Sequence, residues 1–351
     1  MKYRIEVKNE IEKQFAKQWK QLWQSAENAN LYNSYEWFLT CLETDAVKEY
    51  EIHAFYKDDK LIALLPLQQY KIFGVKVWGT LDKDHLLDTG FLIEKYDTSL
   101  IKFFFDNIFT KRNIYLQRVD TQATEMLHKK FPELFISLMS VNPIIKLTND
   151  TFENASSSMK YQMRKLIRKN EKEIEFKMYN TNLEKHLEEI FVLQKKSSKN
   201  ARSMDVFENE GNKKYYRSLT KNCKEFIRIS FLYFNNLPIA YEYGCSYKKH
   251  YAGDQISFLQ EYKKLSPGKL IVYLLLNYLK EKDVNELDMG GGISSYKMSF
   301  TNDYRVLYNI YYSQNKLTMF WWKTVNKARR IKQIGFPKKF TRDHEFLFKT
   351  I

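Results

Sequence analysis

Apolar residues in the first half of the chain recur first at helical spacing and then at strand spacing. Between residues 11 and 23 they return every three or four positions and so share one face of a helix. Ser34 can cap a second helix, and Asp58-Asp59-Lys60 forms a turn between two strand-like stretches. This half therefore predicts helices at 11–23, from residue 34 onward and at 99–109, and strands at 50–56, 61–70, 72–78 and 114–119.

The second half shows the same succession of patterns. Asn235-Asn236 joins two strand-like stretches as Asp58-Asp59 does earlier, and Ala63 and Ala240 end the matching stretches 177 residues apart. Similarity at this spacing favours two copies of one α/β module, although hairpins with Asp or Asn turns also arise independently. Helices are predicted at 157–172, 183–196, 212–221 and 267–280, and strands at 174–179, 226–234, 237–247, 250–258 and 285–288.

These elements predict an α/β (α+β) fold of two lobes, each with a mixed central sheet flanked by helices. No linker rich in Pro, Gly and Ser separates them, and residues 147–158 are the best boundary. We therefore expect an N-terminal lobe at 1–150, a C-terminal lobe at 151–315, and a basic, aromatic tail at 316–351 that packs on the C-terminal lobe.

Composition narrows the class of protein. A hydrophobic fraction of 44% over 351 residues excludes disorder, and the start lacks the apolar region of a secretory signal. The longest nearly apolar run, 270–279, is about half of a membrane span. Three distant cysteines suit a reducing cytoplasm. Neither CxxC nor HExxH occurs, so we predict no metal site.

The net charge of +15 predicts affinity for anions. Arg164 and Arg168 share one face of the predicted helix at 157–172, where they either bind phosphates of a substrate or form a solvated surface. In the tail, Phe320-Trp321-Trp322 precedes Arg329-Arg330. This stretch either lies on the anionic inner face of a membrane or packs onto a sheet.

The start of the helix at 267–280 has the composition of an anion site. Ser266 can cap it, Pro267 suits its first turn, Gly268 allows close approach, and Lys269 adds a cation. Such a start can bind a pyrophosphate, although ordinary helices also begin this way. Beyond it, Asp288 leads into a turn at Gly290-Gly291-Gly292, with Tyr296 and Lys297 following. No GK[ST] follows the glycines, so they are not a Walker loop.

The order of these motifs resembles the CelD/BcsL family of GNAT acetyltransferases, a group similar to the Fem peptidyltransferases. The resemblance rests on Leu237-Pro238-Ile239-Ala240, Ser266-Pro267-Gly268, Asp288, Gly290 and Tyr296-Lys297, and in a degenerate first lobe on the Trp37 helix and residues 61–67. It implies tandem GNAT-like lobes, acetyl-CoA or another acyl-CoA as co-substrate, and an amine acceptor on a sugar or a cell-surface polysaccharide precursor. Two departures are the absent Gln/Arg-x-x-Gly-x-Gly/Ala loop around Gly268 and the stretch 194–197, where the family often carries a His and an aromatic residue.

Acyl transfer to an amine needs a general base and a proton donor for the leaving thiolate. Glu242 and Asp288 are the candidate bases, with a salt bridge or turn cap as the alternative for each, and Tyr296 is the candidate donor. Lys297 is expected to hold a phosphate or an acceptor carboxylate, unless it is a surface cation.

Three functions fit the sequence. The first is N-acyl transfer from acyl-CoA to a small-molecule or lipid-linked amine in the cytoplasm, with or without peripheral contact with an anionic membrane. The second is Fem-like transfer from aminoacyl-tRNA, which the positive charge would suit and in which tRNA would be the nucleic-acid partner. The third is a non-catalytic GNAT-like protein that binds polyanions.

Overall fold

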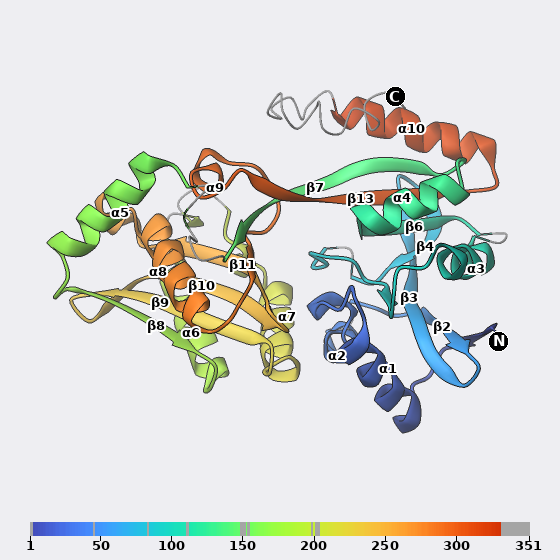
Figure 1. Cartoon of the computed structure of the whole chain (residues 1–351), viewed down its shortest axis with the longest axis horizontal. Helices are drawn as coiled ribbons and strands as arrows, with labels where there is room; N and C mark the ends of the chain where they lie inside the picture. The colour runs from blue at the N-terminus through green and yellow to red at the C-terminus, as the bar shows by residue number, and fades with distance from the viewer. Residues whose placement is uncertain are drawn as a thin grey trace. The chain divides into compact units, whose positions relative to one another are not determined.

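The chain forms two compact units. The computed structural model describes residues 3–44, 46–82, 84–109, 112–147, 152, 155–197, 199–200 and 204–330, with side chains of the last helix as far as Asn326. One unit comprises Met1–Ser140 with Val306–Ile351, and the other Val141–Arg305 (Figure 1). The chain passes from one unit to the other within two long strands, β7 (Phe135–Lys146) and β13 (Asp303–Tyr312). The expected boundaries at 150 and 315 therefore move to 140 and 305.

The two units repeat one order of elements, as the hairpin similarity suggested. The hairpin strands end and begin at an offset of 177 residues, from 57 to 234 and from 60 to 237. The first unit runs β1 (Tyr3–Lys8), α1 (Lys13–Ser25), α2 (Tyr35–Glu43), β2 (Tyr50–Lys57), β3 (Lys60–Ile72), β4 (Val75–Thr80), α3 (Thr98–Ile108), β6 (Ile114–Asp120), α4 (Thr121–Lys130), β7, with a short β5 (Leu92–Ile93) before α3. The second runs β8 (Ile174–Tyr179), α6 (Leu183–Gln194), α7 (Glu210–Asn222), β9 (Ile227–Phe234), β10 (Leu237–Tyr247), β11 (His250–Phe258), α8 (Pro267–Glu281), β12 (Glu286–Asp288), α9 (Ser295–Met298), β13, preceded by α5 (Ser157–Lys169).

Local signals explain where the predictions held and where they failed. Ser34 caps α2, since its side chain accepts a hydrogen bond from the Trp37 amide at 3.1 Å. The strand expected at 72–78 has the wrong bounds. Phe73 and Gly74 form a turn with φ of 49° and 82°, so β4 begins only at Val75. The apolar pattern gave no prediction for β1, α4, β7 or β13. Helix α4, TQATEMLHKK, buries only three residues and so carries a weak apolar period.

In the first unit, strand alternation assigns helices to the two faces of the sheet, whose order is β1-β2-β3-β4-β6-β13. Ile114 and Leu116 of β6 join the core with α3 and α4, whereas Tyr115 between them packs with Tyr311 and Trp322. Trp322 belongs to α10 (Lys316–Arg330) and is fully buried. The described part of the tail therefore packs on the first unit, and for this part our expectation of packing on the C-terminal lobe was wrong; residues 331–351 of the tail lie outside the described residues.

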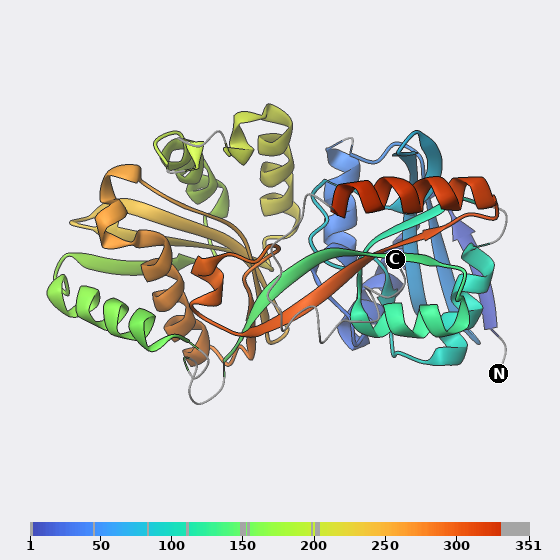
Figure 2. The ribbon, with the colours of Figure 1, turned by 90° about the horizontal axis from the view of Figure 1, so that it is seen from above.

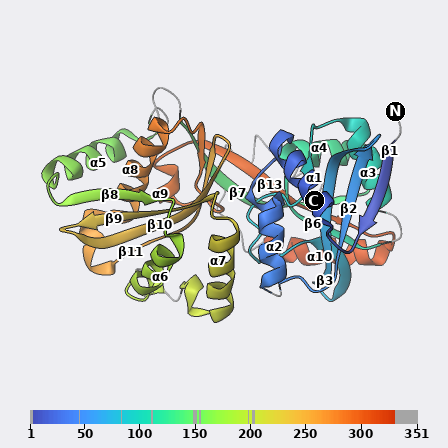
Figure 3. The same ribbon diagram turned by 90° about the horizontal axis from the view of Figure 1, so that it is seen from below.

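In the second unit, the sheet order is β7-β12-β11-β10-β9-β8. Helices α5 and α8 lie on one face of this sheet and α6 and α7 on the other, as the two turned views show (Figures 2 and 3). Helix α8 is apolar around most of its surface and buries eight residues, and its start follows the end of β11 after residues 260–265. Within the described part of the chain, no helix combines the length and apolarity that a membrane crossing requires.

Candidate functional site

The second unit contains a cavity where two neighbouring parallel strands part. Strands β11 and β12 pair only from His250 with Glu286 to Ala252 with Asp288, while β11 continues to Phe258 paired with β10. The opening that follows holds a cavity of about 50 Å³. It is lined by Glu242 of β10, residues 253–256 of β11, Val272 and Leu275 of α8, Leu287 and Met289 at β12, and Tyr296 and Lys297 of α9.

Glu242 supplies the cavity with a buried carboxyl group. Glu242 is 3% exposed, and its Oε2 accepts a hydrogen bond from the Tyr251 hydroxyl at 2.6 Å. Its Oε1 has no hydrogen-bond partner among the described residues. Burial raises the pKa of Glu242 to about 8, although the bond from Tyr251 works in the opposite direction. One oxygen is thus held in place while the other remains available to a substrate.

Two opposed glycines make room for this carboxyl group. The register of β10 shifts between Tyr243 and Gly244, and Gly244 pairs with Gly253 of β11. A Cβ at Gly244 would lie 2.6 Å from Oε1 of Glu242 and 2.7 Å from the Ala252 carbonyl oxygen, and one at Gly253 would lie 3.3 Å from Oε1. Since real Cβ atoms do not approach other atoms within 3.0 Å, glycine at 244 is required for this arrangement.

Tyr296 and Lys297 bring two hydrogen-bond donors to the same cavity. The Tyr296 hydroxyl donates to the Gly268 carbonyl oxygen at 3.3 Å, and burial raises the pKa of Tyr296, so it stays protonated. Lys297 Nζ donates to the carbonyl oxygens of Gly290 at 2.8 Å and Gly291 at 2.9 Å. Burial lowers the pKa of Lys297 to about 8. The structure therefore brings together three of the predicted residues: Glu242, Tyr296 and Lys297.

Asp288 lies at the point where the strands part but does not line the cavity. Its Oδ1 accepts from the Gly290 amide at 2.7 Å, and its Oδ2 accepts from Asn142 Nδ2 at 3.1 Å and from Arg305 at 2.9 Å. Gly290 itself has a φ of 74°. These contacts match the alternative interpretation of Asp288 as a salt bridge and turn cap. Its carboxylate holds the glycine turn in place, and the geometry favours Glu242 as the base.

The start of α8 is open, but not in the way that the sequence suggested. Ser266 adopts a left-handed conformation with φ of 49°, and its side chain does not cap the helix. The expected cap by Ser266 is therefore wrong; its carbonyl oxygen instead accepts from the amides of Lys269 and Leu270. In the first unit, by contrast, the Asp97 carboxylate caps α3 by accepting from the Leu100 amide at 2.8 Å.

A Cβ at Gly268 would meet only the Phe258 ring, at 3.5 Å, which is ordinary contact. Packing within the protein therefore does not demand glycine here. Pro267 is buried in the first turn, and Lys269 is half-buried and does not line the cavity. No side chain caps this helix start, but Pro267 has no N–H and the amides of Lys269 and Leu270 donate to the Ser266 carbonyl oxygen. In this first turn the backbone amide left for an anion is therefore that of Gly268.

Arg164 and Arg168 lie exposed on α5 and do not line the cavity. Asp254 and Gln255, which the sequence analysis missed, do line the cavity, and each accepts a hydrogen bond from a side chain outside its lining. Lys199 Nζ donates to Gln255 Oε1 at 3.1 Å, and burial lowers the pKa of Lys199. The Tyr216 hydroxyl donates to Asp254 at 2.9 Å. Gly244 and Gly253 lie within two neighbouring predicted strands, and glycine inside a strand was the sequence signal that could have indicated the cavity. Among the described residues, no three His, Cys, Asp or Glu side chains gather as metal ligands.

Comparison with known proteins identifies the cavity-bearing segment. Residues 157–298 match the family model described as an acetyltransferase (GNAT) domain, while no curated protein sequence matches the chain.

Three solved structures resemble the whole fold. One, titled FemX, has a TM-score of 0.64 at 9% identity, covering 89% of this chain and 98% of its own. A conserved protein of unknown function from Bacteroides thetaiotaomicron has a TM-score of 0.57 at 11% identity, covering 88% and 100%. The C-terminal domain of a putative lysylphosphatidylglycerol synthetase from Agrobacterium fabrum has a TM-score of 0.56 at 9% identity, covering 88% and 95%. At these identities the likeness concerns the mixed α/β fold alone.

Proposed function

We propose that the protein transfers an acyl group, in particular acetyl, from acyl-CoA to an amine, on the premise that residues 157–298 match the family model described as an acetyltransferase (GNAT) domain. A GNAT domain implies an acyl-CoA-type donor in general. The observation that carries the proposal is the unpartnered Oε1 of Glu242 in a cavity between parting strands. A buried carboxyl group with a pKa near 8 is matched to proton removal near neutral pH.

In the proposed reaction, the acceptor enters as an ammonium ion and Glu242 takes a proton from it, directly or through water. The amine nitrogen then forms a bond to the thioester carbon, and the C–S bond breaks as the tetrahedral intermediate collapses. The thiolate receives a proton from Tyr296, whose raised pKa keeps it protonated beforehand, and Tyr296 is reprotonated by the second proton that the nitrogen loses as the intermediate collapses. The products are an amide and free CoA thiol, and the proton on Glu242 passes to water.

The backbone of β11 beyond Ala252 is suited to polarising the thioester carbonyl. From Gly253 to Phe258 this strand pairs with β10 on one edge but with no residue of β12 on the other. Backbone amides fixed in that position stabilise a developing oxyanion without reorganising. We place the diphosphate of CoA at the start of α8, at residues 266–269, because no side chain caps that helix.

Lys297 lines the cavity, and the half-buried Lys199 donates a hydrogen bond to Gln255 in its wall. Burial is the main cause of the lowered pKa of Lys297, and the positive charge of Lys199 lowers it further. We propose that the two lysines hold an anionic group of the acceptor, such as a carboxylate or phosphate, next to its reacting amine. An amino sugar bound for a cell-surface polysaccharide, free or lipid-linked, is the acceptor class that the family resemblance suggests.

The test measures release of CoA thiol from acetyl-CoA and from longer acyl-CoAs with a panel of amino sugars and their phosphates. We expect turnover above the hydrolysis rate with at least one acceptor, and its loss in Glu242→Gln. Glu175→Gln, an exposed carboxylate on β8 that is paired with Lys177, is the matched control and should keep the rate. Thiol release that never exceeds hydrolysis would contradict the proposal.

An aminoacyl donor is the second candidate, favoured by the net charge of +15. Transfer from aminoacyl-tRNA with no transfer from any acyl-CoA would replace the first proposal with this one. If the protein bound tRNA and other polyanions alike, with a steep salt dependence and no CoA binding, the domain would be a non-catalytic binding module.

A further inference from the structure

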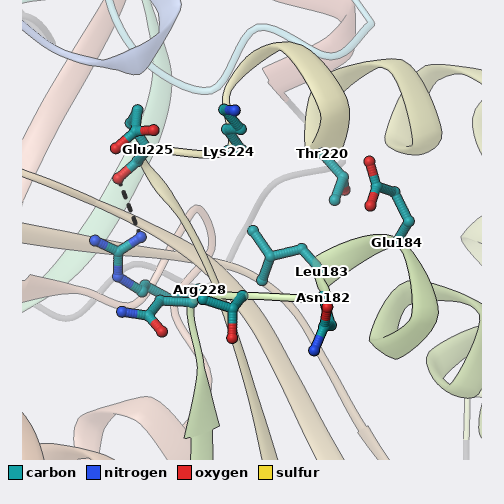
Figure 4. Close-up of a pocket in the computed structure, with 9 residues that line it drawn as sticks. Asn182, Leu183, Glu184, Thr220, Lys224, Glu225 and Arg228 are labelled. Atoms are coloured by element: carbon teal, nitrogen blue, oxygen red, sulfur yellow. Dashed lines mark hydrogen bonds between the residues drawn. The ribbon is translucent and has the colours of Figure 1, made fainter.

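The second unit has two further hollows, at the end of its sheet where β8 ends and β9 begins. The first has a volume of about 380 Å³ and lies between this sheet end, the start of α6 and the end of α7 (Figure 4). The second, of about 350 Å³, lies on the side of α8 and reaches Tyr278 and Lys282. Both are lined by Asn180 and Arg228. We call this pair of adjoining hollows the Arg228 trough.

Arg228 is held in a fixed orientation by the backbone. Its Nη1 donates to the carbonyl oxygen of Glu225 at 3.0 Å and to that of Ile227 at 2.7 Å; Figure 4 draws the first of these bonds. A guanidinium has five N–H donors, so Nε and Nη2 keep three that these two bonds do not use. In the described part of the chain, Arg228 forms no ion pair with a carboxylate. An arginine that is fixed without an anionic partner is prepared to bind one.

Charge and shape in the second hollow fit an anion with an organic part. Its lining contains three cationic residues, Arg228, Lys248 and Lys282, and no carboxylate. Tyr251, Tyr278 and Leu279 supply aromatic and apolar surface there, and Lys282 Nζ lies 5.5 Å from the centre of the Tyr278 ring. The first hollow adds Lys224 but also Glu184 and Glu225. The anion therefore belongs on the side of α8.

We propose that the Arg228 trough binds a small organic phosphate, with its phosphate on Arg228 and Lys282 and its apolar or aromatic body against Tyr278 and Leu279. A hollow of about 350 Å³ lies within the size range of small-molecule sites, roughly 300–1,000 Å³. The site differs from the catalytic cavity, because Glu242, Tyr296 and Lys297 line only the latter; Tyr251, which lines the trough, donates its hydroxyl hydrogen bond to Glu242 between the two. It does not depend on the proposed acyl transfer.

The experiment titrates the full chain with phenyl phosphate by calorimetry at fixed ionic strength, with inorganic phosphate and phenol as partial probes. We expect phenyl phosphate to bind more tightly than either. Arg228→Gln should weaken it about tenfold, as expected for losing charge-assisted hydrogen bonds. Arg217→Gln, an exposed arginine on α7 that is paired with Glu188, is the matched control and should change affinity less than about twofold.

Lys282→Gln is the second variant. Lys282 is exposed, so the substitution should leave folding intact and still weaken phenyl phosphate binding about threefold. If Arg228→Gln fails to fold, the affinity of Lys282→Gln for phenyl phosphate tests the proposal alone. Equal affinity in the wild type and in both trough variants would overturn the proposal, as would the absence of phenyl phosphate binding at millimolar concentration.

Discussion

At the scale of single residues, Glu242 combines features that a merely structural carboxyl group does not need. Tyr251 fixes one oxygen at 2.6 Å, the other oxygen has no partner among the described residues, and glycines occupy the positions where side chains would collide with it. Leaving a buried acceptor unsatisfied costs about 1–3 kcal/mol. This unsatisfied oxygen, Oε1 of Glu242, lies in the cavity. Such a position is expected of a catalytic group whose missing hydrogen bond is made to a substrate.

Glu242→Gln should lower kcat/KM for acyl transfer by at least about 100-fold, because an amide cannot accept the proton. It should also change how stability depends on pH. In the wild type, burial raises the pKa of Glu242 from its usual 4.5 to about 8, so the folded state retains a proton that the unfolded state releases. The stability that Glu242 contributes is full below about pH 4.5 and is lost as the pH rises through about 8.

Thermal unfolding from pH 5 to 9 measures this effect. The wild-type midpoint should fall further over that range than the midpoint of Glu242→Gln. Parallel curves for the two proteins would show that the carboxyl group is not held protonated by the fold.

Lys297→Gln should alter the alkaline side of the pH–rate profile. Glu242 becomes ionised as the pH rises through about 8, while Lys297 loses its charge over the same range. If both charges are needed, wild-type activity rises towards pH 8 and falls above it. The variant should have a raised KM for an anionic acceptor and no fall above pH 8. A fall that persists in Lys297→Gln would assign it to another group.

At the scale of elements, the parting of β11 from β12 creates the site, and glycine placement makes the parting compatible with a buried carboxyl group. Three residue pairs join these strands, and Asp288, held by Asn142, Arg305 and the Gly290 amide, fixes the last of them. The start of α8 is then left open, whereas Asp97 closes the start of α3 in the first unit. The two units share one order of elements, but the helix that follows the hairpin is capped by a side chain in the first unit (α3) and is uncapped in the second (α8).

Gly244→Ala should destabilise the protein by about 1–3 kcal/mol, as overpacking in a core does. Its Cβ would lie 2.7 Å from the Ala252 carbonyl oxygen and 2.6 Å from the Glu242 carboxyl group. Urea unfolding measures the change. Gly90→Ala is the control, since its nearest neighbour would be 3.7 Å away. A stability loss confined to the control would contradict the role given to Gly244.

Gly268→Ala should have the opposite effect on stability. The position is helical with ordinary contacts, so the change should add about 0.5–1 kcal/mol, as alanine does relative to glycine in a helix. If CoA phosphates approach this backbone, the KM for acetyl-CoA should nevertheless rise several-fold. Steady-state kinetics beside unfolding separates the two effects, and an unchanged KM would move the donor site elsewhere.

At the scale of the whole molecule, α10 carries an apolar surface that the first unit does not cover. Trp322 is buried, but Leu317, Phe320 and Trp321 are 78%, 69% and 49% exposed. Trp321 Nε1 donates to the Phe73 carbonyl oxygen at 3.0 Å, which holds that ring at the surface. Exposed lysines at 316 and 323 flank these side chains. Apolar side chains beside cations on a helix are typical of contact with an anionic membrane surface.

We propose that this face of α10 binds vesicles containing phosphatidylglycerol. Leu317→Ser with Phe320→Ser should reduce cosedimentation with such vesicles about tenfold, because two large apolar side chains no longer insert. Neutral phosphatidylcholine vesicles should bind weakly. Val192→Ser, which changes a 65% exposed residue on α6, is the control. Equal cosedimentation of all variants would contradict insertion of these side chains and would attribute vesicle binding to the net positive charge of the protein.

The sequence by itself determined most of the elements of both units. Periodicity and turn residues predicted β8, β10 and β11 to the residue and α8 to within one, because apolar residues recur regularly along these segments and turn residues separate them. The motifs of the sequence and the chemical needs of acyl transfer singled out Glu242, Tyr296 and Lys297. Only the tertiary structure decided that these three share a cavity, that Asp288 forms an ion pair with Arg305, and that the described part of the tail packs on the first unit. Such facts depend on which strands pair and where the pairing stops, and contacts between residues far apart in the chain leave no local period in the sequence.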